Sequence, residues 1–366
     1  MPIPLDEYPI HQSALPMDRV ATSDRNFYDR CYFNAHDRTG EIFLVTGLGV
    51  YPNLGVIDAY AVARLGDRQW SVRFSDALAE RSLDQEVGGY RIEVVKPLQQ
   101  LHLGCTAPDG GGIDFDLDWT AAFPAVQEEP HLVLAGRRPL LDASRFSQLG
   151  RWSGRLRVGK REFTVGADDW SGARDRSWGI RPVGEPEPPA RAAAEQAAAF
   201  WWLYAPLQFE SYALTVILQE SPDGYRTVND AKRVWKDGRV EQLGWPRVEL
   251  SYRAGSRHPE SARLHLTDPA GRPLTLDVET LTSVPLHVGA GYSGDPDWSH
   301  GRWMGRNWSS SSVYDLSDPA VAGRIPFGVS DHLARARLDG EEGWGLFEHA
   351  SIGPHDPTGF TGWSSD

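Results

Sequence analysis

Sulfur-containing residues are scarce in this chain, which has only 2 cysteines and 3 methionines among its 366 residues. Cys31 and Cys105 are too few for a disulfide framework and lack metal-type spacing, so we expect two reduced, buried thiols. The 11 histidines show neither H-E-x-x-H nor H-x-H spacing. We therefore predict no metal site.

Basic charge and long apolar runs are also lacking. The formal net charge is -13, which argues against non-specific binding to nucleic acid or to an anionic membrane, because both attract basic surfaces. No apolar run approaches the roughly 20 residues that span a bilayer, and the first residues show no basic start followed by an apolar core. The sequence thus predicts a cytoplasmic protein without nucleic-acid partners and without membrane insertion.

Motifs for phosphate-bearing cofactors and for one class of hydrolase are missing as well. The glycine-rich stretch APDGGGID (residues 107–114) does not lead from a strand into a helix, so it predicts a hairpin turn rather than a phosphate-binding loop. No G-x-S-x-G elbow is present. We expect no cofactor.

What the chain has in quantity is aromatic residues, with 14 Trp, 13 Phe and 12 Tyr. Aromatic side chains bury large areas and offer flat apolar walls. They suit a cavity for a sizeable hydrophobic ligand, and they suit a plain β core equally well. Composition alone does not separate these two readings.

Most segments read as short strands separated by Gly, Pro, Asp and Asn. Residues 41–51, 56–65, 69–75 and 90–97 follow one another at the spacing of a β-meander. Many short strands with almost no helix predict an all-β protein built from closed or nearly closed antiparallel barrels.

The composition changes once, in a Pro- and Glu-rich stretch that turns Ala-rich. This stretch predicts a linker followed by a short helix over about 190–199. We therefore place an N-terminal barrel at 1–186, the linker and helix at 187–199, and a C-terminal barrel at 200–366.

Short motifs recur in the same order in both halves. LGRWSGR at 149–155 is matched by HGRWMGR at 300–306, and DRSWGIR at 175–181 by EGWGLFEHASIG at 342–353. The order G-R-W-x-G-R and then W-G predicts a duplicated β domain whose second copy carries an insertion at roughly 307–328. The expected fold is two tandem lipocalin-like (calycin) barrels with a short linker helix.

These motifs resemble those of a known family. The D-x-x-W-G pattern of Asp175, Trp178 and Gly179, the two G-R-W-x-G-R segments and the aromatic stretch FWWLYAPLQFESYAL (200–214) are similar to the two-domain, lipocalin-like carotenoid 1,2-hydratase (hydroxyneurosporene synthase) family. The likeness covers the layout of most of the chain through short motifs.

The resemblance implies cofactor-independent lyase chemistry. Such enzymes protonate an alkene in an apolar cavity and let water or an internal group capture the cation, which needs a protonated carboxylic acid and aromatic faces. Where the hydratases carry a histidine after the motif aspartate, this chain has Arg176, and an arginine cannot shuttle protons. Tyr204, Glu210 and Tyr212 stand nearest to the tyrosine and aspartate that follow the motif in the hydratases. A hydrophobic substrate other than a carotenoid is implied.

Asp175 lies in the densest polar and aromatic stretch, DDWSGARDRSWGIRP (168–182). It is a candidate general acid. An ion pair with a neighbouring arginine, Arg174, Arg176 or Arg181, is the alternative, and such a pair would lower its pKa. Trp178 is either a cavity wall or a core anchor.

Asp29 is a second candidate acid. In the strand-like stretch FYDRCYFNAHD (27–37), Tyr28, Arg30 and Tyr32 share one face, whereas Asp29 lies on the other, apolar face. A lone inward carboxylate is costly without a partner. It is therefore either a neutral acid or the partner of an inward arginine.

Glu348 and His349 are candidate bases near the end of the chain, on opposite faces of one strand; the alternative is that both are solvated. The predicted catalytic residues are therefore Asp175, Asp29, Glu348 and His349. The predicted substrate-binding residues are Trp178, Trp202, Tyr204, Tyr28, Tyr32, Tyr212 and Arg176.

The sequence thus predicts a lyase of the hydratase type, or an isomerase, that acts by acid–base chemistry on a hydrophobic, alkene-bearing small molecule. A non-catalytic binding protein for a hydrophobic ligand is the alternative. A homodimer is compatible with either function.

Overall fold

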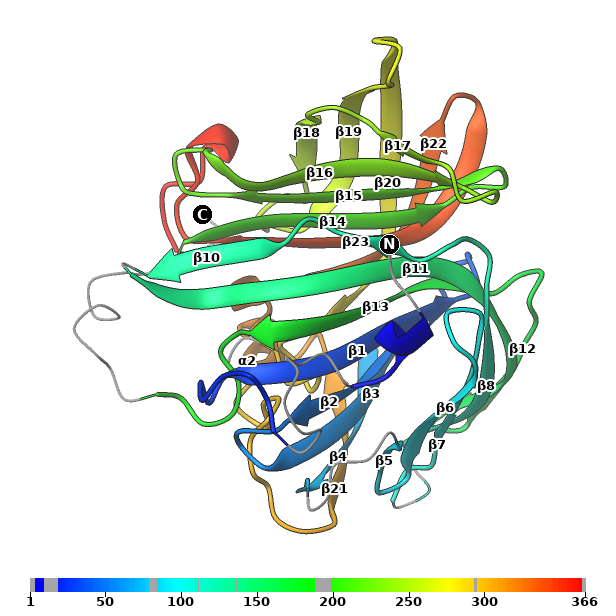
Figure 1. Cartoon of the computed structure of the whole chain (residues 1–366), viewed down its shortest axis with the longest axis vertical. Helices are drawn as coiled ribbons and strands as arrows, with labels where there is room; N and C mark the ends of the chain where they lie inside the picture. Colours follow the sequence, from blue (N-terminus) through cyan, green and yellow to red (C-terminus); the bar gives the residue numbers. More distant parts are fainter. Residues whose placement is uncertain are drawn as a thin grey trace.

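The computed structural model describes residues 4–9, 19–78, 84–108, 110, 112–135, 137–187, 199–292 and 295–363. It consists of two curled antiparallel β-sheets stacked on each other, with almost no helix (Figure 1). The predicted all-β, lipocalin-like class is confirmed. The predicted linker helix at 190–199 lies, apart from its last residue, outside the described residues. Within them, no helix combines the length and apolar character that a membrane crossing requires.

The first sheet has the strand order β21-β4-β3-β2-β1-β13-β11-β8-β7-β6-β5, with β9, β10 and β12 also paired to β11. Its meander is β1 (Phe27–His36), β2 (Ile42–Tyr51), β3 (Val56–Leu65) and β4 (Arg68–Ala77). The following strands are β5 (Gln85–Val87), β6 (Tyr90–Lys96), β7 (Gln100–Cys105) and β8 (Ile113–Ala121). The last are β9 (Val126–Gln127), β10 (His131–Ala135), β11 (Arg138–Val158), β12 (Arg161–Val165) and β13 (Ser171–Ile180).

The second sheet has the order β17-β16-β15-β14-β23-β22-β20-β19-β18. Its meander is β14 (Phe200–Gln208), β15 (Tyr212–Glu220), β16 (Arg226–Trp235) and β17 (Val240–Gln242). The remaining strands are β18 (Arg247–Tyr252), β19 (Pro259–Thr267), β20 (Pro273–Pro285), β22 (Ser330–Leu338) and β23 (Glu341–Ile352). The short helices are η1 (Pro4–Glu7), α2 (Pro319–Ala322), η2 (Ile325–Phe327) and η3 (Asp356–Thr358).

The two sheets repeat one topology. The run β4-β3-β2-β1-β13-β11-β8-β7-β6 matches β17-β16-β15-β14-β23-β22-β20-β19-β18 strand for strand, as a duplicated domain requires. In this correspondence β13 is equivalent to β23, and β11 is equivalent to β22.

The motif pairs that predicted the duplication are, however, not equivalent. Residues 149–155 lie in β11 with Trp152 buried, whereas residues 300–306 form a loop in which Trp303 is 48% exposed. The equivalent of β11 is β22, so the pairing of the two G-R-W-x-G-R segments was wrong. The W-G pairs lie on the equivalent strands β13 and β23, but at opposite ends.

The Trp178-Gly179 pair has a backbone explanation. Gly179 has a φ of +131°, and a Cβ at this position would lie 2.1 Å from the carbonyl oxygen of Asp142 on β11. Only glycine accepts both the positive φ and this close approach. Gly179 therefore lets the end of β13 run tightly along β11.

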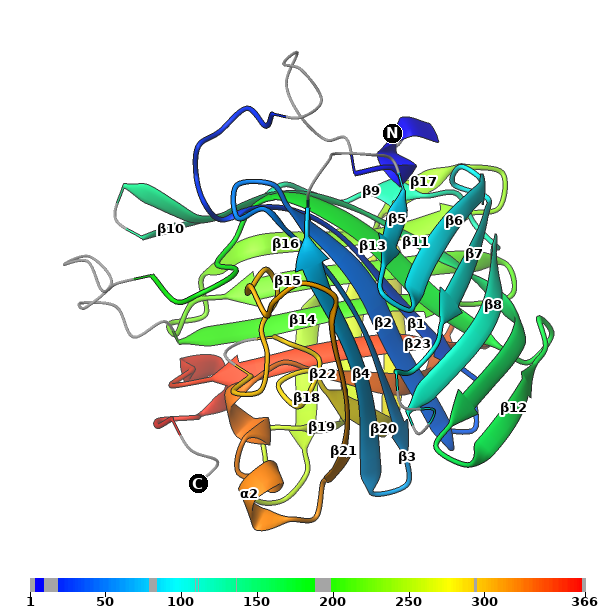
Figure 2. The same cartoon turned by 90° about the horizontal axis from the view of Figure 1, so that it is seen from below.

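The segment predicted as an insertion into the second half belongs to the first sheet. β21 (Trp308–Asp315) pairs antiparallel with β4, from Trp308 opposite Ser75 to Asp315 opposite Arg68. β21 thus extends the first sheet with a strand from the second half of the chain (Figure 2).

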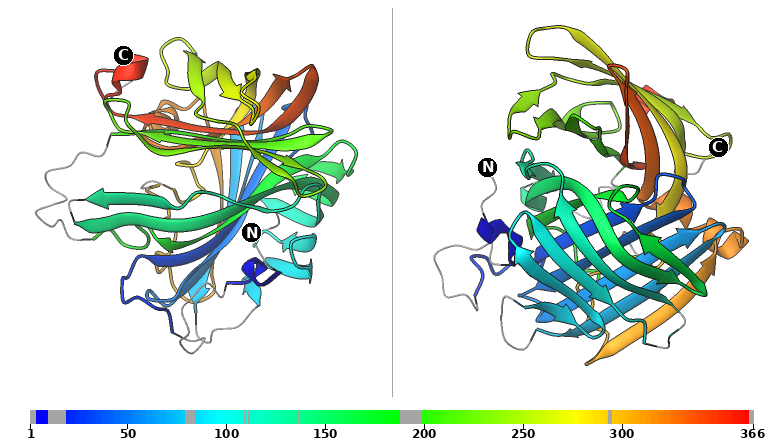
Figure 3. Two further views of the ribbon diagram at one scale, coloured as in Figure 1. Left: turned by 45° about the horizontal axis from the view of Figure 1, so that its top comes forward. Right: turned by 90° about the vertical axis from the view of Figure 1, so that its right-hand side faces the viewer.

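Several central strands are buried on both faces. Every residue of β1, β2 and β15 is buried, and so is every residue of β14 after Phe200. One face of each strand points into its own curled sheet, and the other faces the partner sheet (Figure 3). On β1, Phe33 joins the core of the first sheet, and its neighbour Tyr32 joins a cluster that also contains Tyr204 and Leu333 of the second sheet. The alternation of a β-strand therefore sends every second side chain into the layer between the sheets.

Candidate active site

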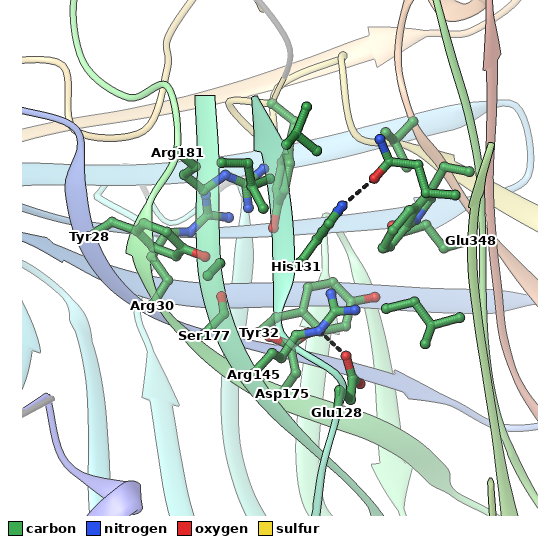
Figure 4. A pocket seen from close by; sticks show the side chains of 18 of the residues that line it. Tyr28, Arg30, Tyr32, Glu128, His131, Arg145, Asp175, Ser177, Arg181 and Glu348 are labelled. Carbon is green, nitrogen blue, oxygen red and sulfur yellow. Dashed lines mark hydrogen bonds and ion pairs between the residues drawn. The ribbon is translucent and has the colours of Figure 1, made fainter. Parts of the chain in front are cut away.

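A cavity of about 290 Å³ lies in this layer between the sheets. Its walls come from β1, β10, β11 and β13 of the first sheet and from β14, β15 and β23 of the second (Figure 4). The volume is near the lower end of the range of small-molecule pockets. Charged, hydroxyl-bearing and aromatic side chains all reach it.

Asp175 projects from the middle of β13 into this cavity. Its strand neighbours are Tyr32 on β1 and Ser147 on β11. Among the described residues, no hydrogen bond or ion pair holds the Asp175 carboxyl, whose accessible surface faces the cavity that it lines.

The surroundings of Asp175 favour its protonated form. Burial raises the pKa of this carboxyl to about 7; the Arg145 guanidinium opposes the shift, and the nearby carboxyls of Glu128 and Glu348 add to it. A carboxyl with such a pKa can still carry its proton near neutral pH and donate it.

The arginines beside Asp175 in sequence point to the opposite face of β13. Arg174 binds Glu7, with Nη2 2.8 Å from Oε2, and Arg176 binds Asp29, with Nη1 2.9 Å from Oδ1. Both ion pairs lie inside the first sheet. They therefore leave Asp175 without either arginine as a partner.

Two further carboxyls form a pair on the second sheet. Asp331 on β22 lies directly across from Glu348 on β23, and the two side chains share a hydrogen bond. Burial raises the pKa of both groups, and their mutual repulsion raises that of Asp331 further. Two buried carboxyls in contact cannot both ionise, so the pair holds a proton at neutral pH.

This carboxyl pair is fixed by donors from both sheets. The Tyr32 hydroxyl donates to Oδ2 of Asp331 at 2.6 Å, and Nδ2 of Asn34 donates to the Tyr32 oxygen at 3.2 Å. The Trp202 indole donates to Oε1 of Glu348 at 2.5 Å. Tyr32 thus links the strand that lies beside Asp175 to the acids of the second sheet.

Arg145 on β11 and Glu128 form an ion pair near Asp175 in the cavity wall (Figure 4). The guanidinium carbon of Arg145 lies 4.4 Å from the centroid of the Tyr204 ring and 5.7 Å from that of Trp202. These contacts place the guanidinium over an aromatic wall.

Trp202 is the centre of that wall. Its ring stacks on His131 at a centroid distance of 5.5 Å and on Phe200 at 6.0 Å. His131 is held by the Gln219 side chain, and burial lowers the pKa of its imidazole to about 4. This histidine is therefore neutral at pH 7 and serves as part of an apolar surface.

The opposite end of the cavity carries two arginines and two tyrosines. The guanidinium carbon of Arg30 lies 4.8 Å from the ring centroid of Tyr292. That of Arg181 lies 5.6 Å from Tyr28 and 6.0 Å from Tyr292. All four residues line the cavity.

The structure brings several of the predicted residues together. Asp175, Glu348, Trp202, Tyr28 and Tyr32 line the cavity. Tyr204 lies behind them, under Arg145.

The other predicted residues lie elsewhere. Asp29 and Arg176 pair inside the first sheet, which matches the alternative of an inward arginine partner. His349 faces the core of the second sheet, where its Nδ1 lies 2.7 Å from the carbonyl oxygen of Trp202. Tyr212 stacks on Phe209 in that core, and Trp178 is not among the cavity-lining residues.

Sequence reasoning missed Asp331, Glu128, Arg145, His131 and Tyr292. Asp331 carried little signal, because it lies between Ser330 and His332 at the polar start of β22, where an acid does not stand out. Arg145 and Glu128 carry no local signal, because in the sequence they cannot be told from charged residues of exposed strands and turns.

The fold and this inter-sheet cavity place the chain among two-domain, lipocalin-like proteins. The chain belongs to a family described as "Family of unknown function (DUF8625)", whose model matches residues 3–361. No curated protein matches the sequence.

Solved structures share the fold at low sequence identity. Kievitone hydratase from Nectria haematococca is 12% identical, with a TM-score of 0.54 over 88% of each chain. An AttH-like protein from Nitrosomonas europaea is 14% identical, with a TM-score of 0.55 over 94% of this chain and 98% of that one. CghA is 13% identical, with a TM-score of 0.52 over 94% and 95%. At these identities the likeness supports the fold.

Proposed function

We propose that this protein is a cofactor-independent lyase of the hydratase type, or an isomerase, that acts on a double bond of a hydrophobic small molecule in the inter-sheet cavity. One observation carries the proposal: the Asp175 carboxyl, unpaired among the described residues, faces a cavity in which its protonated form is stabilised. Kievitone hydratase, which shares the fold, is named for this class of reaction.

In the proposed hydration, Asp175 gives its proton to one carbon of the double bond. A water molecule adds to the other carbon and loses a proton to a base. The Asp175 carboxylate can take that proton back directly. Alternatively, the Asp331–Glu348 pair can accept it, because Glu348 lines the cavity and a pair that shares one proton still has one carboxylate free to bind another. In an isomerisation, a proton leaves instead from the next carbon along the chain, beyond the carbon that carries the developing positive charge, so that the double bond moves by one position. Neither route needs a cofactor.

The aromatic wall has two roles in this scheme. Trp202, Phe200 and His131 present flat surfaces against which a planar, unsaturated ligand can lie. The same surfaces exclude bulk water, which keeps the dielectric low and the acid protonated.

The test is a turnover assay with hydrophobic metabolites extracted from the host, in water enriched in heavy oxygen or in deuterium. Hydration places one heavy oxygen atom in the product, and isomerisation places deuterium on carbon. We expect Asp175→Asn to lower the labelling rate by at least about 100-fold, the usual effect of losing a general acid.

The matched control is Asp116→Asn, the same chemical change on a side chain that is 70% exposed in the first sheet. This variant should label products at the wild-type rate. Full activity of Asp175→Asn would contradict the proposal. Retention of an extracted compound without any labelling would favour the non-catalytic binding protein.

A further inference from the structure

Arg30 is a buried cation that forms no ion pair with any residue in the described part of the chain. It lies in the middle of β1 and is only 6% exposed, yet its side chain lines the cavity. Among the described residues, no hydrogen bond or ion pair holds its guanidinium, which is positioned by the Tyr292 ring 4.8 Å away. Burying an unpaired charge is costly, so such a group indicates a binding role.

Arg181 adds a second cation at the same end. It follows β13 directly, lies over the rings of Tyr28 and Tyr292, and has no ion pair with any described residue. Figure 4 shows Arg30, Arg181 and Tyr28 gathered at one side of the cavity, away from the Arg145–Glu128 pair.

The nearby acids do not neutralise this pair of arginines. Arg145 is the third cation of the cavity, and Glu128 is its partner. Asp58 attracts Arg30 electrostatically, but its carboxyl accepts its hydrogen bonds from the Gly301 backbone at 2.6 Å and the Tyr51 hydroxyl at 3.1 Å. No ion pair joins Asp58 to Arg30, and burial raises the pKa of Asp58 to about 7. The end of the cavity that Arg30 and Arg181 line therefore keeps an excess of positive charge.

We propose that Arg30 and Arg181 form an anion-binding subsite, which receives a delocalised anionic oxygen group of the substrate, such as a carboxylate or a deprotonated enol. This inference rests on the proposed function and names its substrate class: a hydrophobic molecule with one acidic end. Guanidinium groups suit such an anion because their planar donors match two oxygens at once. The apolar remainder of the ligand would extend along Leu286, Val329 and the Trp202 wall towards Asp175.

The subsite and the acid are electrostatically linked. The positive charge of Arg30 lowers the pKa of Asp175, against the larger effect of burial. An anion bound at Arg30 cancels part of that charge. Substrate binding would thus keep Asp175 protonated for the reaction.

The three arginines also bear on the reaction itself. Positive side chains around a cavity disfavour a free carbocation and favour transition states in which negative charge develops. A double bond conjugated to the anionic group, or to a carbonyl next to it, fits this environment better than an isolated alkene.

The test uses two fluorescent probes that share one aromatic skeleton. 8-Anilinonaphthalene-1-sulfonate carries an anionic group, and N-phenyl-1-naphthylamine lacks it. Titration of the full-length protein should show at least tenfold tighter binding of the sulfonate. Arg30→Met and Arg181→Met should each reduce this preference by about tenfold, through weaker sulfonate binding with unchanged binding of the neutral probe.

The control is Arg263→Met, which removes the same charge from an exposed position on β19, where Arg263 binds Asp277 at 2.7 Å. It should keep the wild-type preference. Equal affinity of the wild-type protein for both probes would overturn the inference, whether or not the buried Arg30 variant folds. So would an unchanged preference in the arginine variants.

A further variant separates this inference from the proposed function. Asp175→Asn removes the acid but leaves both arginines, so it should keep the sulfonate preference while losing turnover. Loss of turnover with no sulfonate preference in any form would refute the subsite alone. A sulfonate preference together with full turnover of Asp175→Asn would refute the catalytic role of Asp175 alone.

Discussion

Asp175 owes its chemistry to its orientation on β13. Its sequence neighbours Arg174 and Arg176 are fully paired on the other face, so the carboxyl meets Arg145, Glu128, Glu348 and Arg30 across the cavity rather than the arginines beside it. The ion-pair alternative with the adjacent arginines assumed that neighbours in sequence are neighbours in space. In a strand, adjacent side chains point to opposite faces.

The pH dependence of turnover follows from this environment. Asp175 donates its proton only while protonated, and its pKa is raised to about 7. The second-order rate constant kcat/KM should therefore fall about tenfold per pH unit above pH 7. A pH–rate profile checks this. An Asp175→Glu variant that retained activity should show a shifted midpoint, and a flat profile between pH 6 and 9 would contradict the assignment.

The raised pKa of Asp175 also predicts that replacing this residue by asparagine stabilises the folded protein. The folded-state pKa of Asp175 is above its ordinary value, so ionisation destabilises the folded protein as the pH rises through the range between the two values. Asp175→Asn should be more stable than the wild type at pH 8 by up to about 4 kcal/mol, with the difference shrinking towards pH 4. Thermal unfolding at both pH values measures it; an equal gain at both would rule out this cause.

At the scale of elements, β1 and β13 carry a structural ion pair on one face and the groups that reach the cavity on the other. The pair of Asp29 and Arg176 lies on the face that points into the first sheet, while Tyr32 and Asp175 lie on the face that points to the cavity. The predicted acid Asp29 therefore has the geometry of a structural partner.

Asp29→Asn tests this distinction. Breaking one side of a buried ion pair costs roughly 3 to 5 kcal/mol, so the variant should lose stability in denaturant unfolding while the folded fraction keeps normal probe binding. The double variant Asp29→Leu with Arg176→Met should recover part of the loss, because it leaves no unpaired charge. Normal stability together with lost turnover would restore Asp29 as a catalytic acid.

The equivalent strands of the two sheets carry equivalent pairs. Tyr32 lies opposite Asp175 between β1 and β13, and Tyr204 lies opposite Glu348 between β14 and β23. Each half of the duplicated fold thus contributes one tyrosine and one acid to the layer between the sheets. The second-half counterpart of Asp175 is Glu348, which comparison of short motifs did not reveal.

At the scale of the whole molecule, the two sheets are coupled by a shared core and by β21. The inter-sheet cluster joins residues such as Phe43 and Leu346, and Trp298 is fully buried in it. β21 adds a strand from the second half to the first sheet. The halves therefore depend on each other for burial and for backbone pairing.

We expect a single cooperative unfolding transition, with equal calorimetric and van't Hoff enthalpies. Trp298→Ala should lower the temperature of that one transition, at a cost of about 3 to 5 kcal/mol. The matched control is Trp245→Ala, at a position that is 79% exposed, and it should change little. Two separate transitions in the wild-type protein would show that the sheets fold independently.

The sequence by itself determined the all-β class, the meander order and the two faces of β1 and β23, because side-chain alternation is a local property of the backbone. It therefore separated Tyr32 from Asp29 on β1, and Glu348 from His349 on β23, but it did not tell which face of each strand points to the cavity. Only the tertiary structure decided which inward faces meet: Asp331 with Tyr32, Arg145 with Tyr204, and β21 with β4. These contacts join residues far apart in the chain, and no local pattern encodes them, because they arise when two curled sheets stack.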